Sequence, residues 1–230
     1  MPADLELPCL CLVADTSVAG PGELASRVSA AVAGGVGMVQ LRAKELPGGQ
    51  MLSLAEELKQ ATDGRAVLLV NERVDVAIAA TADGVQLGEE ALPVTKARKL
   101  LPGGALIGRS VHSTDGAADA AAAGADFLVV GTMFATGSHP GAVPAGPGLM
   151  REVFRLLSLS KGSGPLFGIG GITAGNLAEV VAAGASGVAV IRSILGAPDP
   201  QAAAAELKLA LQEAWQSRPP LAEPMPARLP

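Results

Sequence analysis

One type of junction recurs along the chain and limits the folds that it can adopt. An Ala-rich, helix-forming stretch ends at glycine or another small residue and passes directly into an apolar run. The junction occurs at residues 33–41, 82–87, 123–130 and 183–191. Glycine adopts the left-handed conformation that ends a helix, and near-continuous apolar runs are typical of strands covered on both faces. Helical patterns lie between the runs, so the alternation predicts a parallel sheet covered by helices.

Eight candidate strands follow one another in this alternation. They cover residues 7–14, 38–44, 66–71, 84–88, 106–112, 126–133, 165–172 and 188–194. This number of strands favours an α/β fold, a single (β/α)8 TIM barrel over residues 1–216. A doubly wound open sheet would have fewer strands and a Gly-rich first turn, which Asp15-Thr16-Ser17 does not provide. Residues 217–230 carry five prolines without apolar periodicity and are expected to form a disordered or loosely docked tail.

Charge and cysteine content exclude several classes of function. A net charge of -5 and a sequence pI of about 5.1 argue against a nucleic-acid partner, so an anionic ligand needs a local cluster of cations. Cys9 and Cys11 suit neither a disulfide nor a metal site and are expected to be buried thiols. Residues 1–8 do not resemble a signal sequence, and no apolar run reaches membrane-spanning length. We therefore expect a cytoplasmic protein with no membrane partner; a homo-oligomer is possible.

Residues 38–44 combine a strand pattern with convergent positive charge. Gln40, Arg42 and Lys44 share one face of an extended strand, because residues two apart point the same way. Guanidinium and ammonium groups both donate to phosphate oxygens, so we predict a phosphate or diphosphate site at the carboxyl end of this strand. Asn71, at the end of the next strand, would add a neutral donor. The alternative is an edge strand with a solvated polar face.

A second phosphate site is predicted after the last two strands. Gly170 and Gly171 lie toward the carboxyl end of the seventh candidate strand, and Ile191 and Arg192 toward that of the eighth. Glycines let backbone N–H groups approach an anion closely, and barrels often hold a phosphate between these two strands. The carboxyl ends of barrel strands form the active face, so both predicted sites would lie on it.

Two histidines lie near the same strand ends. Ser110 and His112 project in one direction from the fifth strand, where a histidine can exchange protons near neutral pH; the alternative is that His112 caps the next helix. Thr136, Ser138 and His139 belong to a long loop after the sixth strand, which is typical of a segment that covers a ligand. A solvated loop histidine is the alternative for His139.

Few carboxylates occur at these strand ends. They are Asp15, Glu72, Glu89 and Glu90. A bound Mg²⁺ needs one or two carboxylates in addition to diphosphate oxygens. Glu72 is the best candidate ligand because it follows Asn71, whereas Glu89 and Glu90 could equally face water.

Taken together, these motifs resemble the family of thiamine phosphate synthase and its relative TenI, the thiazole tautomerase. The matching stretches are Gln40-Leu41-Arg42-Ala43-Lys44 and residues 70–77, 82–88, 107–113, 124–126, 131–138, 168–172 and 184–194, together with Asn176. They run in order through most of the chain. The resemblance implies a (β/α)8 barrel, a role in thiamine biosynthesis and small phosphorylated molecules as partners.

The resemblance also implies roles for individual residues. In the synthase, the pyrimidine diphosphate ionises and the thiazole nitrogen attacks its methylene carbon, which expels pyrophosphate. Stabilising the departing diphosphate is chiefly electrostatic, so the cations would contribute most to catalysis. For the diphosphate, the implied residues are Gln40, Arg42, Lys44 and Asn71, with Ser110 nearby. Thr136 and Ser138 would lie around the phosphates, and Gly171, Ile191 and Arg192 would bind the thiazole phosphate.

Several positions depart from the synthase pattern. Glu72 and Ala91 stand where the synthase has Mg²⁺-binding aspartates, His139 replaces a lysine, and Gln86 replaces a histidine. The stretch around His112 is closer to TenI, in which the matching histidine moves a proton on the thiazole and no metal is needed. We place the synthase first, because an isomerase acting on a monophosphate has no use for the convergent diphosphate donors. The remaining alternatives are the tautomerase and a non-catalytic barrel that binds thiamine precursors.

Overall fold

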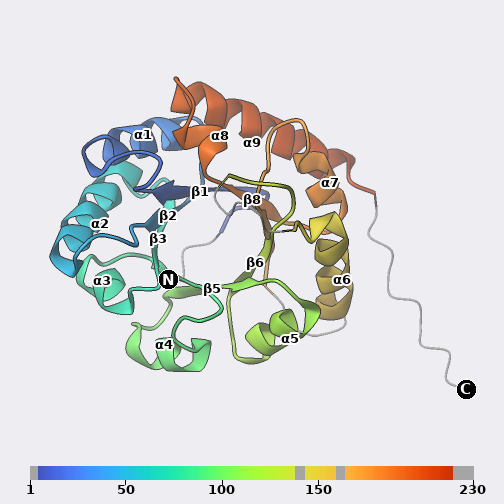
Figure 1. Ribbon diagram of the computed structural model, residues 1–230, viewed down its shortest axis with the longest axis horizontal. Coiled ribbons are helices and arrows are strands. Elements are labelled where there is room, and N and C mark those ends of the chain that lie inside the picture. The colour runs from blue at the N-terminus through green and yellow to red at the C-terminus, as the bar shows by residue number, and fades with distance from the viewer. Residues whose placement is uncertain (1–4, 138–142, 159–163, 220–230) are drawn as a thin grey trace, which may run out of the picture.

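The predicted barrel is confirmed. The computed structural model describes residues 5–137, 143–158 and 164–219, and its strands close into a ring (Figure 1). The strands are β1 (Cys9–Asp15), β2 (Met38–Arg42), β3 (Val67–Asn71), β4 (Gly84–Leu87), β5 (Leu106–Val111), β6 (Phe127–Gly131), β7 (Leu166–Ile169) and β8 (Gly187–Val190). Each strand pairs in parallel with its sequence neighbours, and β8 pairs with β1. The fold is a single (β/α)8 TIM barrel.

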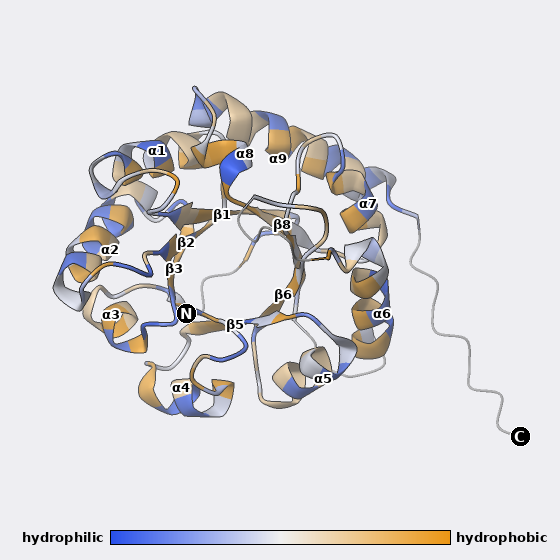
Figure 2. Ribbon diagram, in the orientation of Figure 1, coloured by the Kyte–Doolittle hydropathy of each residue, from blue (hydrophilic) through white to orange (hydrophobic). Residues whose placement is uncertain are grey.

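Helices surround the ring of strands on its outer side (Figure 1). They are α1 (Pro21–Ala33), α2 (Gly48–Thr62), α3 (Val74–Ala79), α4 (Val94–Leu100), α5 (Thr114–Ala122), α6 (Gly146–Ser158), α7 (Leu177–Ala182), α8 (Arg192–Leu195) and α9 (Pro200–Ser217). The last helix, α9, packs against both α1 and α7 and completes the outer layer. Figure 2 shows hydrophilic and hydrophobic residues mixed along the helices and largely hydrophobic strands, as expected when the helices cover the strands and shield them from water.

The helix ends follow local chemistry. At α9, the Asp199 side chain accepts a hydrogen bond from the Ala202 N–H at 3.0 Å. Pro200 occupies the first turn, where a backbone N–H has no partner within the helix, so the missing N–H of proline costs no hydrogen bond. At α5 the cap is Ser113, whose hydroxyl oxygen accepts from the Gly116 N–H at 3.1 Å. The alternative in which His112 caps this helix is therefore wrong.

The barrel interior contains an apolar cluster that is separate from the apolar layer between the strands and the helices. Its central pair is Phe127 and Phe167, whose ring centroids lie 5.5 Å apart in an edge-to-face arrangement. A Cβ at Gly187 would lie 2.6 Å from the Phe167 ring, so glycine there makes room for the ring. Cys9 and Cys11 are free, buried members of this cluster, as predicted, and burial raises the pKa of the Cys9 thiol to about 12.

Several strands end earlier than the sequence predicted. We expected the second strand to reach Lys44, but β2 ends at Arg42 and Lys44 is exposed in the turn that follows. The seventh strand ends at Ile169 because the chain turns at Gly170 and Gly171, which both have positive φ. The shorter strands leave these residues in loops at the rim of the barrel.

Two further expectations concern the chain as a whole. None of the described helices is long and apolar enough to cross a membrane. The predicted tail, residues 217–230, overlaps α9 at Ser217, and its residues from 220 onward lie outside the described part of the chain.

Candidate active site

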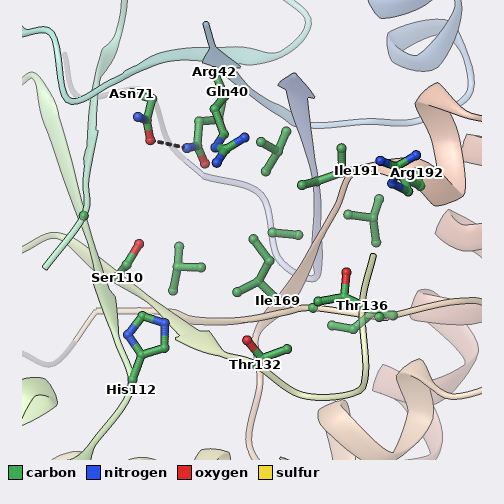
Figure 3. Close-up of a pocket in the computed structure, with 18 of the residues that line it drawn as sticks. Gln40, Arg42, Asn71, Ser110, His112, Thr132, Thr136, Ile169, Ile191 and Arg192 are labelled. Atoms are coloured by element: carbon green, nitrogen blue, oxygen red, sulfur yellow. Dashed lines mark hydrogen bonds between the residues drawn. The ribbon is translucent and has the colours of Figure 1, made fainter. Parts of the chain in front are cut away.

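A cavity at the carboxyl ends of the strands gathers the residues predicted from the two phosphate patterns (Figure 3). Those that line it are Gln40, Arg42, Lys44, Asn71, Glu72, Ser110, His112, Thr136, Gly170, Gly171, Ile191 and Arg192. Ser138 and His139 lie outside the described residues. Figure 3 shows Gln40, Arg42 and Asn71 on one side of the cavity and Thr136 and Arg192 on the other. The two predicted anion sites therefore open into one space.

The first side of the cavity is built on β2 and β3. Gln40 is 7% exposed, and its Nε2 donates to Asn71 Oδ1 at 2.9 Å. This contact joins neighbouring strand ends and fixes the direction of both amides. Lys44 borders the same side from the turn after β2.

Arg42 is held by a buried carboxylate that the sequence analysis did not assign to it. Asp15, the last residue of β1, is 3% exposed and lies opposite Arg42 in the strand register. The Arg42 guanidinium donates to Asp15 Oδ2, while the N–H and hydroxyl of Ser17 donate to Oδ1 at 2.9 and 2.7 Å. Burial opposes ionisation of Asp15, but these donors outweigh it and hold the pKa of the carboxyl below its ordinary value.

The Asp15 carboxylate should stabilise the fold in a pH-dependent way. At pH 7, Asp15→Asn is expected to lower the free energy of unfolding by about 1 to 3 kcal/mol, because Arg42 loses its charged partner. Because the folded pKa is depressed, the contribution is complete above the ordinary value of 3.8 and is lost as pH falls through the folded pKa. Urea unfolding of both proteins at pH 7 and near pH 3 measures this; a constant difference would contradict it.

His112 lies at the mouth of the cavity and is paired with Glu89. Its Nδ1 lies 3.2 Å from Glu89 Oε2, and its backbone N–H donates to Glu89 Oε1 at 3.0 Å. The side chain is 56% exposed. Arg109 holds the backbone of the same loop, because its guanidinium donates to the Glu89 carbonyl at 2.5 Å. The carboxylate therefore fixes one ring nitrogen of His112 and leaves Nε2 for a ligand.

The second side of the cavity depends on glycine backbone. Gly170 and Gly171 have φ values of 102° and 62°, in the left-handed region. A Cβ at Gly171 would lie 2.4 Å from the Ala135 carbonyl oxygen, so only glycine fits this approach. Asn176 fastens the loop, since its Nδ2 donates to the Gly171 carbonyl at 3.0 Å and its Oδ1 accepts from the Thr173 N–H at 2.8 Å.

The base of the cavity is apolar. This surface consists of Val13, Val129, Ile169 and Ala189, which also pack in the interior cluster of the barrel. Sequence reasoning did not select these residues, because apolar residues in strands are the norm in a barrel. A ligand with charged ends and an uncharged ring would meet donors at the rim and this apolar surface at the base.

Glu72 offers the carboxylate that best fits a metal ion. It has a positive φ of 62° and lines the cavity, and a Cβ at Gly88 would lie 2.7 Å from its Oε1. Among the described residues, no three His, Cys, Asp or Glu side chains form a group that could hold a metal. Ala91, which stands where the synthase pattern has a second metal-binding aspartate, packs against the core. A Mg²⁺ ion beside Glu72 would therefore need phosphate oxygens and water for its other ligands.

Comparison with known proteins gives a consistent result. The family model described as thiamine monophosphate synthase matches residues 10–194. A thiamine-phosphate synthase of Methanoculleus marisnigri is 49% identical over 180 residues, which cover 77% of this chain and 83% of that protein. A thiamine-phosphate synthase of Roseiflexus castenholzii is 42% identical over 84% of this chain and 83% of that protein. The structure of thiamine phosphate pyrophosphorylase from Pyrococcus furiosus superposes with a TM-score of 0.80 at 34% identity, over 90% of this chain and 96% of that chain.

Proposed function

The chain belongs to the thiamine monophosphate synthase family, and from this membership we propose which side of its cavity binds each of two substrates. Its activity is that of a thiamine-phosphate synthase, a transferase of thiamine biosynthesis. The reaction joins hydroxymethylpyrimidine diphosphate to thiazole phosphate and releases pyrophosphate. This assignment of the two substrates rests on the observation that the Arg42 side and the Gly171 side border one cavity.

The Arg42 side would receive the diphosphate. When the bond between the pyrimidine methylene carbon and the diphosphate oxygen breaks, the oxygen keeps the electron pair and negative charge grows on the leaving group. Arg42 and Lys44 would stabilise that charge, with Gln40, Asn71 and Ser110 as neutral donors. Donors that are already in place need no reorganisation at this moment, which makes such stabilisation effective. Asp15 supports this role because it fixes the Arg42 guanidinium.

The Gly171 side would receive the thiazole phosphate. Gly170 and Gly171 bring backbone to the cavity surface without side chains, and Arg192 supplies a charge nearby. Ile191 would border the thiazole phosphate, and we propose that Thr136, with Ser138 and His139 from the same loop, contacts the phosphates. Holding this substrate across the cavity directs the thiazole nitrogen toward the methylene carbon and removes the entropic cost of a free encounter.

His112 and Glu72 would serve the same reaction from the cavity mouth. With Nδ1 held by Glu89, His112 Nε2 would be available to exchange a proton with a bound substrate. Glu72 would hold Mg²⁺ together with diphosphate oxygens. The ion, when bound, would offset part of the negative charge of the diphosphate.

Supplying both substrates with and without Mg²⁺ tests this function. We expect pyrophosphate and thiamine phosphate to appear in equal amounts and only with the metal. Glu72→Gln should raise the Mg²⁺ concentration for half-maximal rate by at least about tenfold, the smallest effect usual for residues that support a metal site. Glu90→Gln, in an exposed neighbouring carboxylate, is the matched control.

The other outcomes of this experiment distinguish the alternatives. Isomerisation of the thiazole phosphate without pyrophosphate release would identify a thiazole tautomerase, and binding without turnover would identify a non-catalytic barrel. The three relatives described above are named as synthases or as a pyrophosphorylase, which favours the synthase. The cytoplasmic location and the homo-oligomer stay predictions.

A further inference from the structure

Gln86 is a buried polar residue next to the cavity that the reaction described above does not use. It lies on β4 and is 2% exposed. In the strand register it is flanked by Asn71 of β3 and Gly108 of β5. Its Nε2 donates to Ser110 Oγ at 3.0 Å. Its Oε1 is buried without a hydrogen-bond partner among the described residues.

This arrangement determines what the Ser110 hydroxyl can do. A serine hydroxyl has one hydrogen to donate and two lone pairs to accept with. Because the Gln86 amide occupies one lone pair as a donor, the hydroxyl hydrogen is not needed for this contact. Ser110 lines the cavity, so the hydrogen is available to an anionic ligand there (Figure 3).

The opposite orientation of the amide is less favourable. If Oε1 accepted from Ser110, the NH₂ group would occupy the buried position and two N–H donors would lack acceptors. Buried N–H groups without partners are rarer than carbonyl oxygens without them. In that orientation the hydroxyl hydrogen would also point away from the cavity.

The neighbouring strand leaves room for this amide. A Cβ at Gly108 would lie 2.1 Å from Gln86 Oε1 and 2.2 Å from the Phe127 ring. Glycine at this position therefore allows the glutamine to reach Ser110 above the interior aromatic pair. The amide has a defined place in the packing, and its oxygen remains without a partner in that place.

We infer that Gln86 is a positioning residue that keeps Ser110 as a hydrogen-bond donor toward the diphosphate. The inference rests on the proposed contact between Ser110 and the diphosphate. It explains why a buried glutamine with an unpartnered oxygen lies beside the site. Gln86 acts only through Ser110 and does not touch the substrate.

A double-mutant cycle tests this dependence. Gln86→Met removes the donor with little change of shape and is expected to lower kcat/KM for the pyrimidine diphosphate about three- to tenfold, the effect of one neutral hydrogen bond. Ser110→Ala should lower it roughly 10- to 100-fold, because its partner is charged. The double variant should match Ser110→Ala alone. The unfolding midpoint of Gln86→Met should not fall, since the unpartnered oxygen is removed as well, and Gln60→Met, at an exposed site on α2, controls for the substitution.

A second variant reverses the hydrogen bond. In Gln86→Glu, an ionised carboxylate would accept the Ser110 hydrogen and repel the diphosphate, whereas a protonated carboxyl would donate as the amide does. The ratio of its kcat/KM to that of wild type should therefore rise as pH falls through the pKa of the introduced group, which burial raises. Glu72, Glu89, His112 and the substrate phosphates are present in both reactions, so the ratio removes their contribution to the pH profile. This profile also decides the question if Gln86→Met does not fold.

The outcomes separate the inference from the proposed function. Wild-type kinetics for Ser110→Ala would overturn the contact with the diphosphate and the inference together. If Ser110→Ala is impaired but Gln86→Met costs the same factor in both backgrounds, or nothing, the inference alone is overturned. A pH-independent ratio for Gln86→Glu would likewise overturn it.

Discussion

Arg42→Ala is expected to lower kcat/KM for the pyrimidine diphosphate by about 10²- to 10³-fold, the largest loss among single substitutions at the rim. Removing one well-placed donor from a site that stabilises developing charge typically costs this much. Arg42 supplies both a full charge and hydrogen bonds, and its guanidinium is fixed by Asp15. The loss should appear mainly in kcat, because the charge on the leaving group grows as the bond breaks. Initial rates of pyrophosphate release at varied pyrimidine diphosphate measure it.

The design of this experiment must separate catalysis from stability. Truncating Arg42 leaves Asp15 buried with only its Ser17 donors, so Arg42→Ala should also unfold at lower denaturant concentration. Asp15→Asn/Arg42→Ala removes the unpaired charge and should recover part of the stability without recovering the rate. The control for losing an arginine is Arg65→Ala. Arg65 precedes β3 in the chain, and its side chain is 52% exposed. Turnover close to wild type in the double variant would contradict the role of Arg42.

Gly171→Ala is expected to have the second-largest effect, on the other substrate. A Cβ at this position would lie 2.4 Å from the Ala135 carbonyl oxygen, and the φ of 62° is unfavourable for residues with side chains. The loop must shift to relieve this overlap, so the KM for thiazole phosphate should rise about 100-fold, in line with the effect of a roughly 1 Å misplacement. Binding of the pyrimidine diphosphate, measured by calorimetry, should remain near wild type.

The same loop contains a matched control for this substitution. At Gly175, a Cβ would have only Thr173 Oγ1 near it, at 3.9 Å. Gly175→Ala should therefore leave both KM values unchanged. An unchanged KM for thiazole phosphate in Gly171→Ala would show that this side of the cavity does not bind the phosphate. A loss of both substrates, together with a lower melting temperature, would instead indicate collapse of the loop.

The fold could be predicted because its signals are local. Each of the four junctions at residues 33–41, 82–87, 123–130 and 183–191 combines an Ala-rich stretch, a small residue and an apolar run within about ten positions. Gly35, Gly124 and Gly184 indeed have positive φ values of 104°, 85° and 117°. Strand limits were less accurate, since the point at which β2 stops depends on where its neighbours stop pairing. Lys44 was therefore predicted to extend the strand and instead lies in the following turn.

The site could be predicted only in part, for a related reason. The rule that residues two apart share a face was enough to predict that Gln40 and Arg42 point together, and both line the cavity. The pairing of Asp15 with Arg42 joins positions 27 apart and depends on the register of two strands, which sequence alone did not supply. The contact between Gln86 and Ser110 is of the same kind, with a separation of 24.

The aromatic pair inside the barrel has a consequence for how molecules reach and leave the site. Phe127 and Phe167 fill the interior beneath Val13, Val129 and Ala189, so the cavity is a well closed at its lower end. Within the part of the chain that the structure describes, both substrates then enter, and both products depart, by way of the rim, which is a shared entrance. A product that stays bound near Arg42 or Gly171 thus blocks the binding of the next substrate, and the turnover rate depends on how quickly products dissociate through that shared entrance.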